Sequence, residues 1–173
     1  LLQAAIAPLI ALLEREEEAD WIREELPDVM AQIGPAAIEP LESFAADRDH
    51  NFYGRSAACN SLVKIAQSYP ETRQKTIDFL RTFLSAYPDE TPDDETFRGF
   101  VISDLLDLKA REAYSDIEAA FAEDRVDDLV VGLDDVQQEL GIRGKTKPRK
   151  RAEFELRLKC RECGFTRPYA VDV

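Results

Sequence analysis

A short apolar pattern recurs along the first 120 residues of this chain and restricts the folds available to it. Residues 4–9, AAIAPL, return 32 residues later at 36–41 as AAIEPL. The Ile-x-x-apolar spacing then returns at Ile77 and at Ile117, with offsets of 39 and 40. Self-similarity with a period of roughly 20–50 residues is typical of repeat proteins, in which each unit buries its apolar face against its neighbours. The pattern therefore predicts stacked helical units that share one continuous core.

An arginine stands near the head of the apolar helix that precedes each of the last three copies. Arg23, Arg55 and Arg98 each lead into apolar residues at the i, i+3, i+4 spacing of a helix. Gly34-Pro35 and Tyr69-Pro70 follow the first two of these helices, and a proline such as Pro35 suits the first turn of a new helix. Each repeat is thus predicted to be a helix pair, A and then B, of about 32–43 residues. We expect the three arginines to be structural.

These patterns resemble the HEAT-like repeat, especially the short subtype that also occurs in phycobilin lyases. The resemblance is carried by residues 34–41, GPAAIEPL, and by 55–58, RSAA, together with Leu62 and Ile65. It covers roughly residues 1–125 and implies a mainly α fold, a right-handed, armadillo-type α-solenoid of three to four helix pairs. It also implies that each arginine bonds an acidic side chain or a carbonyl of a neighbouring repeat. The later units depart from the pattern, since they lack a proline within the B helix and follow a long acidic loop at 88–95.

Charge divides the chain into an acidic body and a basic end. The net charge is −13, but residues 1–142 hold 12 basic and 31 acidic residues, whereas residues 143–173 hold 10 basic and 4 acidic ones. An acidic body repels a phosphate backbone, so nucleic-acid binding is expected only through the tail. We predict a helical body at 1–140, a basic linker at 141–151 and a β-hairpin at 152–173. The basic residues of the linker are Lys145, Lys147, Arg149, Lys150 and Arg151.

The tail alternates with the period of a strand. Residues 154, 156, 158 and 160 are apolar or cysteine and the residues between them are charged, which predicts a strand with one buried side. The sequence Cys160-x-x-Cys163-Gly164 follows at the expected turn. Two cysteines at this spacing resemble half of a zinc ribbon, and a structural zinc site needs four ligands. The other two could come from a longer chain or from a partner chain, or no metal binds; the sequence leaves these alternatives open.

Other features narrow the function. The longest apolar run has ten residues, 4–13, too few to cross a bilayer, and no secretion leader opens the chain, so we expect a cytoplasmic protein without membrane contact. The chain starts at a B helix, which suggests a fragment or a homodimer contact at that end. His50, the single histidine, is expected to cap a helix, and Cys59 to be a small buried apolar residue.

We predict a non-enzymatic scaffold that binds a basic protein partner. A structural zinc ion, in the case that Cys160 and Cys163 bind metal, is the only cofactor that the sequence suggests. Two alternatives stay open, a bilin lyase-like enzyme acting on a chromophore-carrying protein and a nucleic-acid adaptor that works through the basic tail. The B helices would supply the contact surface. Its expected polar residues are Glu39, Glu42, Arg73, Asp78, Arg81 and Glu118.

Overall fold

The structure, a computed structural model, describes residues 2–14, 19–85, 92–142, 156–159 and 166–169. Contacts between Cα atoms divide the chain into two compact units, Leu1–Arg143 and Gly144–Val173. Each unit is described by itself.

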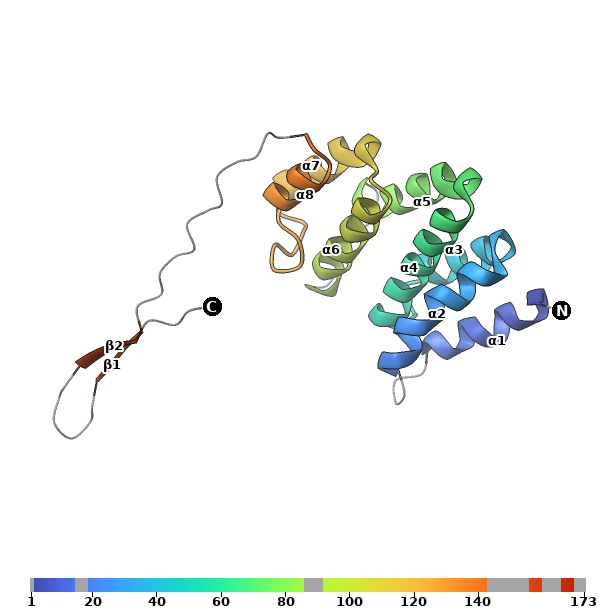
Figure 1. Cartoon of the computed structure of the whole chain (residues 1–173), viewed down its shortest axis with the longest axis horizontal. Coiled ribbons are helices and arrows are strands. Elements are labelled where there is room, and N and C mark those ends of the chain that lie inside the picture. Colours follow the sequence, from blue (N-terminus) through green and yellow to red (C-terminus); the bar gives the residue numbers. More distant parts are fainter. Residues whose placement is uncertain (1, 15–18, 86–91, 143–155, 160–165, 170–173) are drawn as a thin grey trace. The chain divides into compact units, whose positions relative to one another are not determined.

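The first unit is built from helices of two kinds, A and B, which alternate along the chain (Figure 1). The A helices are α2 (Ala19–Ile33), α4 (Phe52–Ser68) and α6 (Pro92–Asp107). The B helices are α1 (Ile6–Ala11), α3 (Ile38–Ala46), α5 (Arg73–Ser85) and α7 (Tyr114–Ala122). A last short helix, α8 (Leu133–Glu139), follows them. The predicted mainly α fold is confirmed for the described part of this unit.

Every B helix is preceded by a 3-10 turn. These turns are Leu2–Ala5, Pro35–Ala37, Pro70–Thr72 and Arg111–Ala113. Pro8 and Pro40 are both the third residue of their α-helix, in the first turn, where a missing N–H leaves no helical hydrogen bond unmade. The recurring AAI-x-PL segment is therefore the start of a B helix in both places.

Gly34 makes the turn between α2 and α3. Its φ is 82°, in the region that only glycine adopts without strain. Its N–H donates to the carbonyl of Met30 at 3.0 Å, and its own carbonyl accepts from Ala37 at 3.0 Å. A side chain on Gly34 would also collide with the ring of Tyr69, whose atoms lie 2.8 Å from the position of a Cβ. The Gly-Pro break read from the sequence thus ends one helix and starts the next.

The A helices form one layer and the B helices another. Helix α4 packs between α2 and α6, whereas α3 and α5 each pack against α4. Helix α5 also contacts α6 and α7, and α1 contacts α3. We call α2, α4 and α6 the A layer, and α1, α3, α5 and α7 the B layer. One hydrophobic core lies between them; its largest fully buried apolar side chains include Met30, Leu41, Leu62, Ile65, Ile77, Leu80 and Ile102.

Both ends of the core are covered within the described residues. On α1, Ile6 is buried and Leu9 and Ile10 are partly buried against the core. Ala7, Pro8 and Ala11 of the same helix are exposed, so the described side chains of α1 leave a face of small apolar residues in solvent, as expected. At the other end, α8 buries Val136 and Leu140, and Gln137 donates to the Tyr114 hydroxyl at 2.8 Å. The homodimer contact stays a prediction.

The second unit contains two short strands. Strand β1 (Leu156–Lys159) pairs antiparallel with β2 (Thr166–Tyr169), with Leu156 opposite Tyr169 and Lys159 opposite Thr166. The segment that joins them, with Cys160 and Cys163, lies outside the described residues.

Candidate functional site

The six residues predicted to contact a partner all lie in the B layer. Glu39 and Glu42 are on α3, Arg73, Asp78 and Arg81 on α5, and Glu118 on α7. None of the six is fully buried. The structure therefore places all six on successive B helices.

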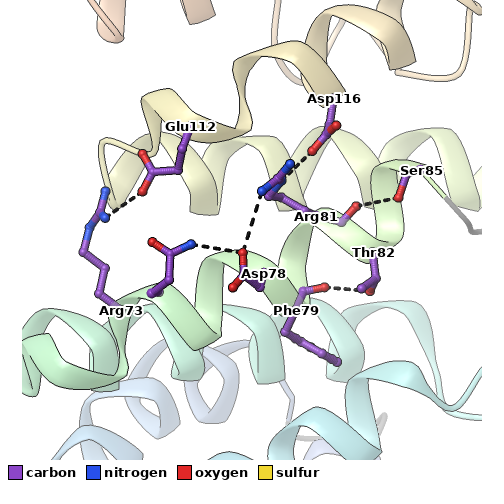
Figure 2. Close-up of polar contacts among 9 residues, drawn as sticks. Arg73, Asp78, Phe79, Arg81, Thr82, Ser85, Glu112 and Asp116 are labelled. Carbon is purple, nitrogen blue, oxygen red and sulfur yellow. Dashed lines mark hydrogen bonds and ion pairs between the residues drawn. The ribbon is translucent and has the colours of Figure 1, made fainter.

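Several of these residues are held by bonds between helices (Figure 2). Arg81 on α5 donates from Nε to Asp116 of α7 at 2.5 Å and lies 3.7 Å from Asp78 on its own helix. Asp78 also accepts from the side-chain amide of Gln74 at 3.0 Å. The bond to Asp116 raises the pKa of Arg81, which is charged at any physiological pH in either case. This group ties α5 to α7.

Arg73 covers the end of an A helix. Its Nη2 donates to the carbonyl of Leu108 at 2.9 Å and to that of Lys109 at 3.3 Å, just beyond the end of α6, where carbonyls have no partner within the helix and the helix dipole is negative. Its Nη1 bonds Glu112 at 2.8 Å (Figure 2). A hydrogen bond from the backbone of Glu112 itself, and then Arg73, lower the pKa of this carboxyl. Arg73 thus stabilises a contact between repeats.

The acidic residues among the six differ in the bonds that they make to other residues of the chain. Glu42 pairs with Lys75 of α5 at 3.0 Å, and its buried Oε1 has no bonding partner within the described part of the chain. Glu118 is exposed and accepts from the Tyr114 hydroxyl at 2.9 Å. Glu39 is exposed as well. Glu39, Asp78 and Glu118 are the exposed predicted carboxylates, and of these Asp78 is engaged by Gln74 and Arg81.

The structural role expected for the recurring arginines is confirmed at two of the three positions. Arg55 is buried and donates from Nε to the carbonyl of Ala45 at the end of α3, at 3.0 Å. Arg98 is buried and donates to the carbonyls of Phe83 at 3.2 Å and Arg125 at 3.0 Å. Arg55 and Arg98 therefore each satisfy a carbonyl near the C-terminal end of the preceding B helix. The side chain of Arg23 lies outside the described residues.

His50 does not cap a helix, contrary to expectation. Asn51 caps α4 instead, since its side chain accepts from the N–H of Gly54 at 2.8 Å. His50 stacks on Phe44 with ring centroids 3.9 Å apart, and its Nδ1 lies 2.6 Å from Glu14. The shorter Asn side chain reaches the helix amide from the position directly before the first turn. Cys59 is fully buried, as expected, and burial raises the pKa of its thiol well above the usual range.

A buried carboxylate in α6 was missed by the sequence reasoning. Asp104 is 6% exposed and accepts from the side-chain amide of Asn60 on α4 at 3.1 Å. Burial raises the pKa of Asp104 to about 7, the bond from Asn60 opposes the rise, and the nearby charge of Asp107 adds to it. Asp104 lies three residues after Val101 and four before Leu108. An acidic residue inside an apolar helical stripe is the signal that could have revealed it.

Comparison with known families adds one finding to this geometry. A family model described as a protein of unknown function, DUF1186, matches residues 9–155. The chain belongs to the DUF1186 family. Searches of the curated proteins and of the solved structures give no match. The DUF1186 match begins within α1 and continues past α8, so α3, α5, α7 and Asp104 all lie inside it.

The remaining predicted residues of this DUF1186 chain cannot be placed. Cys160, Cys163 and the basic residues between 145 and 151 lie outside the described part of the chain. Within the described residues, no group of three or more metal-ligating side chains comes together. No helix in that part has both the length and the apolar character needed to cross a membrane.

Proposed function

We propose that this chain is a non-enzymatic docking protein, a HEAT-like α-solenoid whose B layer binds a basic segment of a protein partner. The alternation of A and B helices, with a 3-10 turn before every B helix in the described part, supports the solenoid. Stacked pairs present an extended surface, which repeat proteins use to bind other proteins.

The observation that carries the proposal is the B layer, whose helices are linked by ion pairs and hold five acidic and three basic residues. Ion pairs join α3 to α5 through Glu42 and Lys75, and α5 to α7 through Arg81 and Asp116. A surface held in this way loses little conformational freedom when a partner binds. The acidic excess of residues 1–142 attracts a basic partner over distances comparable to the Debye length, about 8 Å at physiological ionic strength.

The zinc knuckle remains part of the proposal. Cys160 and Cys163, two residues apart, would supply half of a tetrahedral site. Its role would be structural, holding the turn between β1 and β2. No catalytic group is assigned.

The test compares two charge reversals of equal size. Partners would be captured by crosslinking in the source cells, identified, purified, and their affinity for the full chain measured by calorimetry. The double variant Glu39→Lys/Glu118→Lys is expected to weaken binding at least tenfold. The control, Asp128→Lys/Asp135→Lys, changes the net charge equally at exposed positions outside the B layer.

The control is expected to change the affinity less than threefold. Equal losses in both variants would mean that only net charge matters and would refute a defined docking surface. Unchanged affinity in both variants would mean that the partner binds a different surface of the chain, and would refute docking on the B layer.

A further inference from the structure

A groove crosses the A layer between α4 and α6. Its volume is about 310 Å³, and residues of α2, α4 and α6 line it. Phe52 and Asn60, near its two ends, are eight residues apart on α4, which corresponds to about 12 Å of helix. We call it the α4–α6 groove. It lies in the A layer and shares none of the six residues predicted for the B layer.

One end of the groove is aromatic and open. Tyr53 is 59% exposed and Phe100 is 40% exposed, and both are among the few large apolar side chains that the described part leaves in solvent. Phe52 fixes their positions, with ring centroids 4.9 Å from Tyr53 and 5.7 Å from Phe100, both in edge-on contact. Aromatic side chains that remain exposed at the rim of a groove are typical of surfaces that another protein covers.

The other end is acidic. Asp104, Asp107 and Glu24 line it, and no lysine or arginine is among the described residues of the lining. The amide of Asn60 donates to Oδ1 of Asp104, whereas no donor from the described part of the chain reaches Oδ2. A carboxylate this deeply buried is costly unless a positive charge or further donors meet it. The groove thus joins an apolar wall to a carboxylate that no cation among the described side chains meets.

We propose that the α4–α6 groove binds a lysine side chain carried by an extended segment of another protein. The ammonium meets the free oxygen of Asp104 together with Asp107, the methylene stem lies along the aromatic wall, and the neighbouring residues of the segment cover Tyr53 and Phe100. Lysine fits better than arginine because a compact ammonium needs one acceptor oxygen at Asp104, whereas a bidentate guanidinium needs both. A small diamine would leave the exposed rings uncovered.

This inference goes beyond the proposed function, because it assigns a specific side-chain ligand to the other layer. The B-layer docking proposal and the lysine-binding proposal for the α4–α6 groove can fail independently. If the B-layer reversal has no effect, the groove can still bind lysine, and if lysine fails to bind, the B layer can still dock a partner.

The test uses three synthetic peptides with the full chain. The probe is acetyl-Gly-Leu-Lys-Leu-Gly-amide, and the comparison peptides carry norleucine or arginine in place of lysine. Norleucine keeps the methylene stem and removes the charge. Binding is followed through the ¹H–¹⁵N resonances, with the side-chain amide of Asn60 and the backbone amides of Tyr53 and Phe100 as reporters.

The lysine peptide is expected to shift these reporters along one saturable curve. The norleucine and arginine peptides should bind at least tenfold and about threefold more weakly, respectively. Asp104→Asn and Phe100→Ala should each weaken the lysine peptide at least fivefold, whereas Asp128→Asn, an exposed position outside both the groove and the B layer, should leave it unchanged.

Equal binding of lysine and norleucine peptides would overturn the proposal. So would shifts spread over all acidic surfaces, or full binding by Asp104→Asn. Because Asn keeps the size of Asp and an acceptor for Asn60, this variant is expected to stay folded, and its amide spectrum verifies that directly.

Discussion

Replacing Asp104 by asparagine should make the protein more stable above neutral pH. The carboxyl is buried in α6, with Cys59 and Asn60 facing it from α4, Asp107 one turn away on its own helix, and Glu24 of α2 at the same groove. Asparagine retains an oxygen that can accept from Asn60 and carries no charge. The substitution therefore removes a buried charge and leaves the packing almost unchanged.

The magnitude follows from the pKa of Asp104, which rises from 3.8 to about 7 on folding. Between these values the folded state binds a proton that the unfolded state has released, so stability falls as pH rises, by about 1.4 kcal/mol per pH unit. The full loss is about 4 kcal/mol, of which about 2–3 kcal/mol falls between pH 5 and pH 8. The Asp104→Asn variant carries an uncharged side chain at this position, so its unfolding free energy does not include this pH-dependent loss. Between pH 5 and pH 8 the difference in unfolding free energy between variant and wild type should therefore grow by about 2–3 kcal/mol in favour of the variant, which corresponds to roughly 5–10 °C in Tm.

The assay is urea unfolding of both chains at pH 5, 6, 7 and 8, followed by circular dichroism. The quantity that matters is the difference in unfolding free energy between variant and wild type, because other titrating groups cancel in it. Asp128→Asn, an exposed aspartate outside the core, serves as the control and should give a constant difference near zero. A difference for Asp104→Asn that stays flat from pH 5 to pH 8, or a wild type that is more stable at pH 8, would refute the reasoning.

Three further predictions test other parts of the structure. Arg98→Met removes the bonds from a buried guanidinium to the carbonyls of Phe83 and Arg125 and should cost about 2–4 kcal/mol in urea unfolding. The exposed Arg111→Met should cost below about 1 kcal/mol, and equal losses would contradict the structural role of the recurring arginines. Gly54→Ala places a carbon 2.6 Å from a backbone oxygen of the segment before α2, so a loss of about 1–3 kcal/mol is expected, and an unchanged Tm would show that the two segments do not pack this closely. Zinc measured by native mass spectrometry should be lost in Cys160→Ser/Cys163→Ser; one ion per two chains would indicate a shared site, and zinc retained by the double variant would rule the pair out as ligands.

The helical pairing could be predicted because local signals and the apolar pattern agree. Gly34 and Pro35 end one helix and begin the next, and the i, i+3, i+4 stripe around Leu62 turns the inner face of α4 to the core. The 3-10 turns before the B helices were not predicted. They depend on a few i→i−3 bonds, such as those from Thr72 to the carbonyl of Tyr69 at 2.9 Å and from Arg73 to the carbonyl of Pro70, and no residue type specifies that choice strongly.

The candidate site was predicted only in part. Alternation of layers follows from the repeat, so the six polar residues were placed on the correct helices. Their partners were not foreseen, because Arg81 could meet solvent, a partner or Asp116, and only the distance between α5 and α7 decides among these. Asp104 was missed for a different reason. In a chain with 35 acidic residues, one carboxylate within an apolar stripe is easily taken for an exposed one.

The repeat period also predicts which polar side chains bond to each other between neighbouring repeats, a signal that was not used in the sequence analysis. The bonded pairs between neighbouring repeats are separated by 35 residues for Arg81 and Asp116, 39 for Arg73 and Glu112, and 44 for Asn60 and Asp104. A polar side chain whose complement stands one period along the chain is therefore expected to bond within the array. Substituting it would change stability first and binding only as a consequence. Carboxylates without such a complement remain for a partner, which is why the binding tests use Glu39 and Glu118 and leave Arg73 and Arg81 intact.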